Sequence, residues 1–491
     1  MTRRYRRGVV AAGHPSVCDA AAQVLRSGGN AFDAAVTAGF VSAVAEPALT
    51  SLGGGGFLLS RSVDGSAKLF DFFSDTPGRD GLLDDLEPHF LPVTVRFPGF
   101  EQIFNIGLGS AAVPGNLKGF LHVHTRLGRL PLTDVLAPAV RLAREGIPLS
   151  GQQAYFLRLL RPIMTLTPAA RALYAPGGEL LGEGDLLVNS DLASFLETLP
   201  ADGGRELYEG GLARRISSEM REGQGLLTET DLACYRVAER KPLEARYRDH
   251  LLLTNPPPAF GGSLLVLALE LLERCSWPAG VPASPEHGGA LLDVMQEVEC
   301  RRSEHLAKQR VFTRGTTHVS VCDADGNAAS MTTSNGEGSG YIVPGTGIML
   351  NNMLGEDDLH PEGFHASSPG QRVASMMSPS ILLSDDEVRL VLGSGGSKRI
   401  RTALLQSISW VVDFGLSVRE AVEHPRLHWD GECVQVEPEL PGALLAALRE
   451  RADVNEWDCQ DVYFGGVHAV IPGHEGAGDP RRGGAARTVA A

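Results

Sequence analysis

The sequence has no long apolar run and no surplus of positive charge, and each absence excludes a class of protein. Its longest apolar stretches, 31–48 and 263–272, are interrupted by small or polar residues, so we expect no transmembrane helix. The net charge of −15 argues against nucleic acid or an anionic membrane surface as a partner. With 43% apolar and 21% charged residues, the composition is that of an ordinary globular protein.

The sequence also shows no cysteine-pairing motif and no pattern typical of a leader segment. The seven cysteines are odd in number and contain no CxxC motif, which favours reduced thiols over a disulfide framework. The chain starts with a basic stretch, 3–7, but no apolar region follows before His14-Pro15. We therefore expect no signal peptide and a cytoplasmic protein, without excluding export.

What the sequence does contain is a hairpin rich in hydroxyl groups at 315–335. Apolar residues alternate with small or polar ones on both sides of a turn at 323–327, where Gly326 can supply a positive φ. The stretch begins Gly315-Thr316 and carries several more threonines and serines. Two interpretations stay open at this point: threonines chosen for their strand propensity, or a hairpin that holds an activated Thr nucleophile.

Helical patterns dominate before about residue 310 and strands after it, which predicts an α+β fold. Ala31 to Val44 has such small side chains that we expect a helix buried against a close neighbour. We expect an irregular loop over 80–108 and a loose tail, in part, over 474–491. The other expected elements include helices at 16–27, 114–124, 131–146, 189–199, 263–273, 286–307, 401–414 and 418–423 and strands at 57–60, 67–70, 347–351, 380–383 and 388–392.

Other candidate sites have simpler structural explanations. The glycines at 53–56 do not continue into a P-loop, and His122 and His124 lie on a predicted helix that would separate them. Glu356-Asp357-Asp358 lacks a calcium-binding loop and suggests a solvated acidic turn. We therefore predict no metal and no cofactor. Gly393 to Ser397 follows a clean strand, and its backbone N–H groups could stabilise an oxyanion or simply form a turn.

Taken together, the motifs resemble the gamma-glutamyltranspeptidase family of N-terminal-nucleophile hydrolases. They follow the order of that family from about residue 8 to 490, so the set is far more specific than any single match. The matching segments are 10–15, 28–35, 53–57, 113–115, 231–235, 315–321 with 325–328, 350–352, 377–379 and 395–396.

The resemblance implies a four-layer αββα sandwich and a zymogen that cuts itself autocatalytically before Thr316. The products would be a large subunit, 1–315, and a small subunit, 316–491, which pair in one intertwined fold. Thr316 would attack Gly315 in the precursor and an amide substrate after the cut, with its new α-amino group as base. Gly395 and Gly396 would hold the oxyanion. Ser334 would be the second hydroxyl beside the nucleophile.

The substrate-binding positions depart from the family pattern. Phe73 stands where the family has an Arg that grips the substrate α-carboxylate, and Ser375-Met376 replaces a pair of serines. Losing a charged hydrogen bond of this kind costs roughly 1.5–3 kcal/mol. The stretch between 352 and 375 is also short, which suggests that a lid is missing. The remaining candidates for substrate contact are Thr333, Asn335 and Glu356, with Asp357 as an alternative to Glu356.

The function that the resemblance implies is a γ-glutamyltransferase or glutathione hydrolase, which transfers the acyl group to water or an amine. The alternative is an acylase of the same superfamily, similar to cephalosporin or glutaryl acylases, with a non-glutamyl substrate. A third hypothesis is a non-catalytic, unprocessed scaffold. The acyl donor and acceptor do not follow from the sequence.

Overall fold

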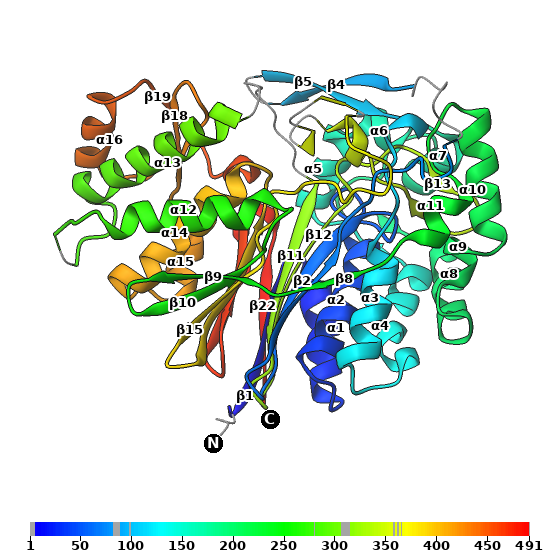
Figure 1. The fold of residues 1–491 in the computed structure, drawn as a ribbon, viewed down its shortest axis with the longest axis horizontal. Coiled ribbons are helices and arrows are strands. Elements are labelled where there is room, and N and C mark those ends of the chain that lie inside the picture. The colour runs from blue at the N-terminus through cyan, green and yellow to red at the C-terminus, as the bar shows by residue number, and fades with distance from the viewer. Residues whose placement is uncertain are drawn as a thin grey trace.

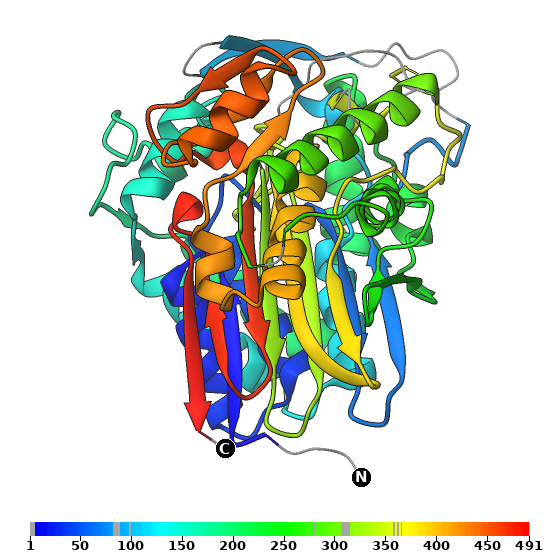
Figure 2. The same ribbon diagram turned by 90° about the vertical axis from the view of Figure 1, so that its left-hand side faces the viewer.

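The computed structural model describes residues 5–81, 89–97, 100–278, 280–305, 315–356, 359–360, 363–364 and 366–490. Within them, two antiparallel sheets pack face to face, and each carries a layer of helices on its outer side (Figures 1 and 2). This is the predicted four-layer αββα sandwich. It buries two apolar cores, because each sheet has to cover both of its faces.

The first sheet has seven strands and brings distant parts of the chain together. The hairpin that contains Thr316 lies in its middle, and its edge strand is the end of the chain. In spatial order the strands are β22 (Ala485–Ala490), β1 (Arg7–Ala12), β11 (Thr316–Cys322), β12 (Ala328–Ser334), β2 (Gly55–Arg61), β3 (Ala67–Phe72) and β8 (Ala238–Arg240).

The second sheet has six strands and faces the first across the central core. Its strand β16 packs against both β11 and β12. In spatial order the strands are β21 (Glu475–Ala477), β20 (Gly466–Ile471), β16 (Glu387–Gly395), β15 (Ser380–Ser384), β10 (His250–Thr254) and β9 (Leu243–Tyr247).

Helices cover the outer face of the first sheet. The helix α2 (Ala31–Ala45) is almost wholly buried between α1, α4 and the sheet, as its small side chains predict. A capping box of Asn30 and Asp33 starts it. The longer helices of this side are α1 (Pro15–Arg26), α3 (Asn116–Leu127), α4 (Leu132–Glu145), α5 (Gly151–Leu159), α8 (Ser190–Asp202) and α10 (Gly211–Glu222). The shorter ones are α6 (Arg161–Met164), α7 (Pro168–Tyr174), α9 (Arg205–Tyr208) and α11 (Glu229–Cys234).

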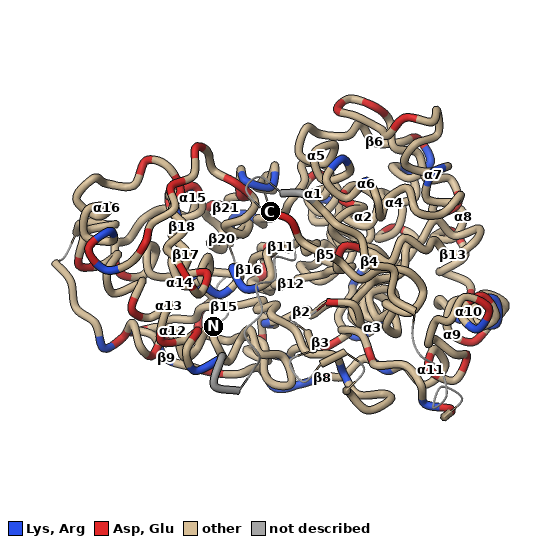
Figure 3. The backbone as a smooth tube through the Cα atoms, turned by 90° about the horizontal axis from the view of Figure 1, so that it is seen from above, with Lys and Arg blue, Asp and Glu red and all other residues tan. Residues whose placement is uncertain are grey.

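A second set of helices covers the six-stranded sheet, with α14 packed against β16 and β20 (Figure 1). They are α12 (Phe260–Glu273), α13 (Pro285–His305), α14 (Arg399–Phe414), α15 (Val418–Glu423) and α16 (Gly442–Arg449). No helix of the described residues is long and apolar enough to cross a membrane. Acidic and basic residues are interspersed along the backbone rather than gathered by sign (Figure 3).

Two expectations from the sequence are wrong. Part of 80–108 forms a hairpin, β4 (Leu91–Phe97) with β5 (Phe100–Ile106), at the top of Figure 1. The tail is not loose: it forms β21, a short 3-10 turn at Pro480–Arg482, and β22, which pairs along the whole of β1. A tail rich in Gly, Arg and Ala was misread because its order comes from pairing with a strand nearly 480 residues away.

Small sheets complete the fold. They are β6 (Ile147–Pro148) with β7 (Leu186–Leu187), β13 (Ile342–Val343) with β14 (Ile348–Met349), and β17 (Leu427–Trp429), β18 (Val434–Val436) and β19 (Val454–Glu456).

Candidate active site

The two faces of β11 have different surroundings, which determines what each hydroxyl can do. His318 faces the six-stranded sheet, since a Cβ on Gly393 would lie 2.2 Å from His318 Cε1. Thr316, two residues earlier on the strand, shares this face. Thr317 lies on the opposite face and donates to Glu46. The alternation of a β-strand therefore places Thr316 between the sheets and Thr317 beneath the helices.

Thr316 and Ser334 form the end of the hairpin. They are direct partners in the β11–β12 register, and both are buried. Thr316 Oγ1 donates a hydrogen bond to Ser334 Oγ at 3.3 Å. The structure thus brings together the predicted nucleophile and the predicted second hydroxyl.

Ser334 in turn contacts the peptide that precedes Thr316. Its hydroxyl donates to the carbonyl oxygen of Gly315 and accepts a hydrogen bond from the Gly336 N–H at 3.0 Å. A Cβ on Gly315 would lie only 1.5 Å from the Gly336 carbonyl oxygen. Glycine is therefore required at position 315 by close contact with the backbone of the neighbouring strand end.

A buried arginine holds the other side of Thr316. Arg482 donates from Nη1 to the Thr316 carbonyl oxygen at 2.9 Å and is 1% exposed. It projects from the short turn at Pro480–Arg482, which Asp479 caps by accepting from the Arg481 N–H. Sequence reasoning missed this residue. The Asp-Pro-Arg-Arg run signalled a capped turn, but an arginine is ordinarily exposed, and nothing local indicated burial.

The predicted oxyanion glycines lie at the end of β16. Gly395 packs against Thr316 with no room for a side chain, and Gly396 has a φ of 119°, which favours glycine. The chain then turns through Ser397 into α14. The position fits backbone donors beside the nucleophile, and the oxyanion role itself stays a prediction.

A cavity opens beside the two hydroxyls, and its wall combines apolar side chains with hydroxyl groups and one carboxyl group. Of the predicted substrate-binding residues, Phe73, Glu356, Ser375 and Met376 line it; the other lining residues are Thr316, Ser334, Met353, Leu359, Met377, Ser397 and Ile400. No lysine or arginine is among the described lining residues. The cavity therefore offers an acyl group several apolar side chains, one carboxyl group and several hydroxyls.

Phe73 is fixed in place from both sides. Its ring stacks on Phe57 with centroids 5.5 Å apart, and its carbonyl oxygen accepts hydrogen bonds from Tyr235 and Arg372. The Arg372 guanidinium also pairs with Asp75 at 3.1 Å. The Arg372 guanidinium thus lies close to the backbone of Phe73, but its charge is paired with Asp75 in the same loop as Phe73.

Three more residues are predicted to contact substrate, Thr333, Asn335 and Glu356, and only Glu356 lines the cavity. Glu356 is buried, which contradicts a solvated turn, and its Oε1 would lie 2.0 Å from a Cβ on Gly336. Asp357 lies outside the described residues. Thr333 faces the helices and bonds Thr50 at 3.0 Å, and Asn335 bonds the backbone of neighbouring loops. The last two do not line this cavity.

His122 and His124 lie on α3 as predicted and have separate partners. His122 contacts Glu239 at 2.9 Å, and His124 contacts the Leu130 carbonyl oxygen at 2.9 Å. The described residues contain no cluster of three or more side chains able to hold a metal ion.

Two buried titratable groups lie near the start of β11. Burial raises the pKa of Glu46 to about 7, with its hydroxyl partner Thr317 and the charge of Arg482 opposing the shift. Burial holds the pKa of His318 well below its usual range, so this imidazole is neutral between Thr332 and Ser320. His318 thus acts as a hydrogen-bonding spacer between the sheets.

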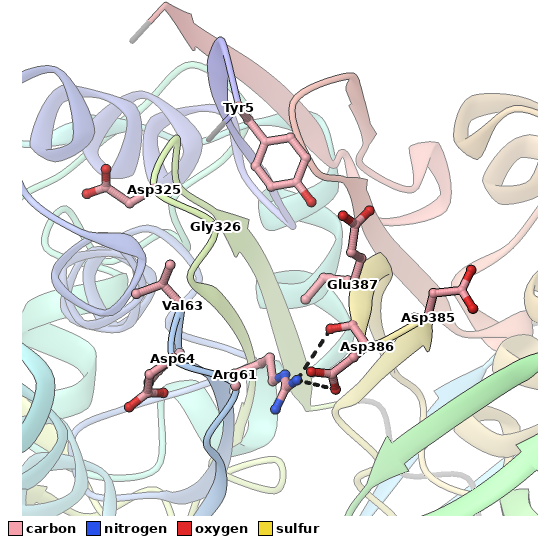
Figure 4. Close-up of a pocket in the computed structure, with 12 residues that line it drawn as sticks. Tyr5, Arg61, Val63, Asp64, Asp325, Gly326, Asp385, Asp386 and Glu387 are labelled. Carbon is pink, nitrogen blue, oxygen red and sulfur yellow. Dashed lines mark hydrogen bonds and ion pairs between the residues drawn. The ribbon is translucent and has the colours of Figure 1, made fainter. Parts of the chain in front are cut away.

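A second, larger hollow lies at the far end of the hairpin, around its turn (Figure 4). Its lining includes Asp64, Asp325 and Asp385, and Arg61 bridges to Asp386 at 2.6 Å. It has no contact with Thr316, so size does not identify the reactive site here.

Known proteins match nearly the whole length of the chain. The family model described as Gamma-glutamyltranspeptidase matches residues 18–313 and 302–489. The chain is 32% identical to an acylase ACY 1 proenzyme of Pseudomonas sp. (strain SE83), covering 91% of this chain and 86% of the relative. It is 30% identical to a glutathione hydrolase proenzyme of Escherichia coli (strain K12), covering 97% and 91%.

Solved structures match as well. A cephalosporin acylase from Bacillus halodurans superposes with a TM-score of 0.81 at 25% identity, covering 99% of this chain and 96% of that one. The gamma-glutamyltranspeptidase of Helicobacter pylori gives a TM-score of 0.52 at 30% identity over 60% and 82%.

Proposed function

The chain belongs to the gamma-glutamyltranspeptidase family and is an enzyme of the N-terminal-nucleophile hydrolase type, and from this premise we propose that Thr316 is its nucleophile. The observation that carries the proposal is the relay from Thr316 Oγ1 to Ser334 Oγ to the Gly315 carbonyl oxygen. It connects the attacking hydroxyl with the peptide that has to be cut. The family's relatives named above are proenzymes, which supports a processing step.

The first reaction is self-cleavage. Thr316 Oγ attacks the Gly315 carbonyl carbon, and Ser334 donates to the oxygen on which negative charge develops. The C–N bond between Gly315 and Thr316 breaks, the nitrogen takes a proton, and an ester links Gly315 to Thr316 Oγ. Water then hydrolyses the ester. The products are a large subunit, 1–315, that ends in a carboxylate and a small subunit, 316–491, that begins with a free amino group.

The second reaction is acyl transfer. The α-amino group of Thr316 accepts the hydroxyl proton while Oγ attacks a substrate amide, and the same proton passes to the leaving amine. The backbone N–H groups of Gly395 and Gly396 stabilise the tetrahedral oxyanion. Water, or an acceptor amine, then releases the acyl group from Thr316.

For the substrate we propose γ-glutamyl amides such as glutathione, because a glutathione hydrolase is among the relatives that cover nearly the whole chain. Glu356, at the cavity wall, is the carboxyl group available to the α-amino group of such a donor. Ser375 is the hydroxyl left for its carboxylate.

One observation favours a second candidate, an acylase that takes a non-glutamyl acyl group. Phe73 and Met376 replace polar groups of the family pattern at the cavity wall, and no described lysine or arginine lines it. A donor α-carboxylate would therefore lack a cation there, at a cost of roughly 1.5–3 kcal/mol. The fold match to a cephalosporin acylase over nearly the whole chain points the same way.

A gel and two substrates test the proposal. Purified protein should separate under denaturing conditions into two bands that meet at 315/316, and Thr316→Ala should give one uncut band. The processed enzyme should release aniline from a γ-glutamyl anilide or from a neutral acyl anilide, and the ratio distinguishes the two substrate classes. A wild-type chain that stays whole and inactive would support the scaffold hypothesis and contradict ours.

A further inference from the structure

Glu46 is a buried carboxyl group with no place in the steps above. It follows the last turn of α2 as its C-cap and is 0% exposed. Its Oε1 accepts a hydrogen bond from Thr317 Oγ1 at 3.0 Å. Thr317 follows Thr316 directly in the chain. The carboxyl group of Glu46 therefore holds the beginning of β11, the strand that carries the proposed nucleophile.

Polar groups from two other elements, β11 and β20, converge on the same point. A Cβ on Gly13 would lie 2.4 Å from Glu46 Oε1, 2.9 Å from Thr317 Oγ1 and 3.3 Å from His468 Nε2. The absence of a side chain at position 13 is what allows α2, β11 and β20 to bring these atoms together. His468 Nε2 has no hydrogen-bond partner among the described residues.

Arg482 links Glu46 to Thr316 a second time. Its charge acts on Glu46, and its guanidinium donates to the Thr316 carbonyl oxygen. Glu46 is therefore coupled to Thr316 through Thr317 on one side and through Arg482 on the other. An isolated helix end needs no such group, and burying a carboxyl group is costly compared with an amide or an apolar side chain.

We propose that Glu46 is a positioning residue for Thr316, holding the start of β11 through Thr317 and setting the local electric field together with Arg482. This inference rests on the proposed role of Thr316 as nucleophile. Glu46 lies on the helix-covered face of the seven-stranded sheet, whereas the proposed reaction takes place on the opposite face, between the two sheets.

The charge of Glu46 should also affect the pH dependence of activity. Of the other titratable groups nearby, burial lowers the pKa of His468 to about 4 and raises that of Cys18 to about 12, so both are neutral near pH 7. Arg482 remains the charged neighbour. Ionised Glu46 places negative charge one residue from the Thr316 amino group, which raises the pKa of that amine.

The test compares Glu46→Gln with wild type in the processed enzyme. Glutamine keeps an oxygen acceptor for Thr317 but has no charge. We expect kcat to fall about tenfold with KM within twofold, and the acid limb of the kcat/KM profile to move to lower pH by about half a unit or more. Asp33→Asn, a buried carboxylate at the opposite end of α2, should change stability but not this profile.

Thr317 supplies a second pair of variants if Glu46→Gln fails to fold. Thr317→Val removes the hydroxyl at nearly constant shape and should lower kcat about as much, whereas Thr317→Ser keeps the hydroxyl and should restore it. If no assay substrate turns over, the rate of precursor cleavage serves as the readout.

Two results would overturn the inference: a Glu46→Gln enzyme with the kcat and pH profile of wild type, or equal kcat for Thr317→Val and Thr317→Ser. Either result leaves the nucleophile assignment standing. That assignment fails separately, if Thr316→Ala is cut and active.

Discussion

The hydroxyl group of Ser334 donates a hydrogen bond to the carbonyl oxygen of Gly315, across the end of the central hairpin. The carbonyl belongs to the peptide bond that joins Gly315 to Thr316. A serine on the second strand therefore polarises the bond that the first strand is proposed to break.

Ser334→Ala should slow self-cleavage, because it removes the donor to the developing oxyanion. Loss of one such donor typically costs on the order of 10²-fold in rate. The uncut chain should accumulate on a denaturing gel during a time course after purification. Ser330→Ala is the matched control, since Ser330 lies on the same face of β12 and bonds the Leu392 carbonyl oxygen instead. Equal cleavage rates for the two variants would contradict the role assigned to Ser334.

Gly395→Ala should abolish turnover. The new methyl group would meet the Thr316 carbonyl oxygen at 2.3 Å and the Arg482 guanidinium carbon at 3.1 Å, so the strand end has to move. Overpacking of this kind costs about 1–3 kcal/mol in stability, and the displaced backbone donors should cost activity beyond that. Gly442→Ala, where an added Cβ meets nothing within 4 Å, should leave both properties unchanged. Thermal melting and anilide hydrolysis measure the two effects.

The pair Phe73→Arg and Met376→Ser should shift substrate preference toward γ-glutamyl donors. It returns to the cavity the cation and the hydroxyl of the family pattern. A charged hydrogen bond of roughly 1.5–3 kcal/mol corresponds to a change of about 10- to 100-fold in relative kcat/KM. The measurement is the ratio of γ-glutamyl anilide to neutral acyl anilide turnover, with Phe73→Leu as the control for loss of the aromatic ring. An unchanged ratio would show that position 73 does not select the acyl group.

Stability should fall as the pH drops from about 6.5 toward 4. Burial lowers the pKa of His287 from 6.5 to about 4, so the unfolded chain binds a proton in this range that the folded chain does not. Glu46 acts in the opposite direction. Because its pKa is raised, its contribution to the free energy of unfolding is full below about pH 4.5 and is lost as the pH rises through about 7. His287→Gln should keep a partner for Ser409 and flatten the acid decline of the melting temperature. A decline as steep as that of wild type would count against His287.

Sequence reasoning succeeded where the pattern was local and failed where contact came from a distant segment. The alternation of the 316–334 hairpin and the small side chains of α2 were readable, because strand and helix periods are local properties. The family order supplies Thr316 and Ser334 as candidates for the two hydroxyls, and Gly395 and Gly396 as candidates for the oxyanion donors. Arg482 and Glu46 escaped notice, because charged residues are ordinarily exposed and only the assembled fold buries them beside Thr316.

The predicted substrate-binding residues show the same difference between local and distant information. Phe73 and Met376 depart from the family pattern, and the structure places both at the cavity wall. Thr333 is a candidate on sequence grounds because it neighbours Ser334. The alternation of a strand sends its side chain to the helical face, toward Thr50.

The strand order has a consequence for how a cut enzyme would persist. Cleavage before Thr316 would leave the segments 1–315 and 316–491 interleaved: β1 lies between β22 and β11, β12 pairs with β2, and β10 pairs with β15. Dilution alone cannot separate pieces that share four ladders, so the cut protein should melt as one cooperative unit. Refolding, however, would become a bimolecular association of the two subunits, and its rate would depend on their concentration. The lifetime of the cut protein would then be set by the height of its unfolding barrier.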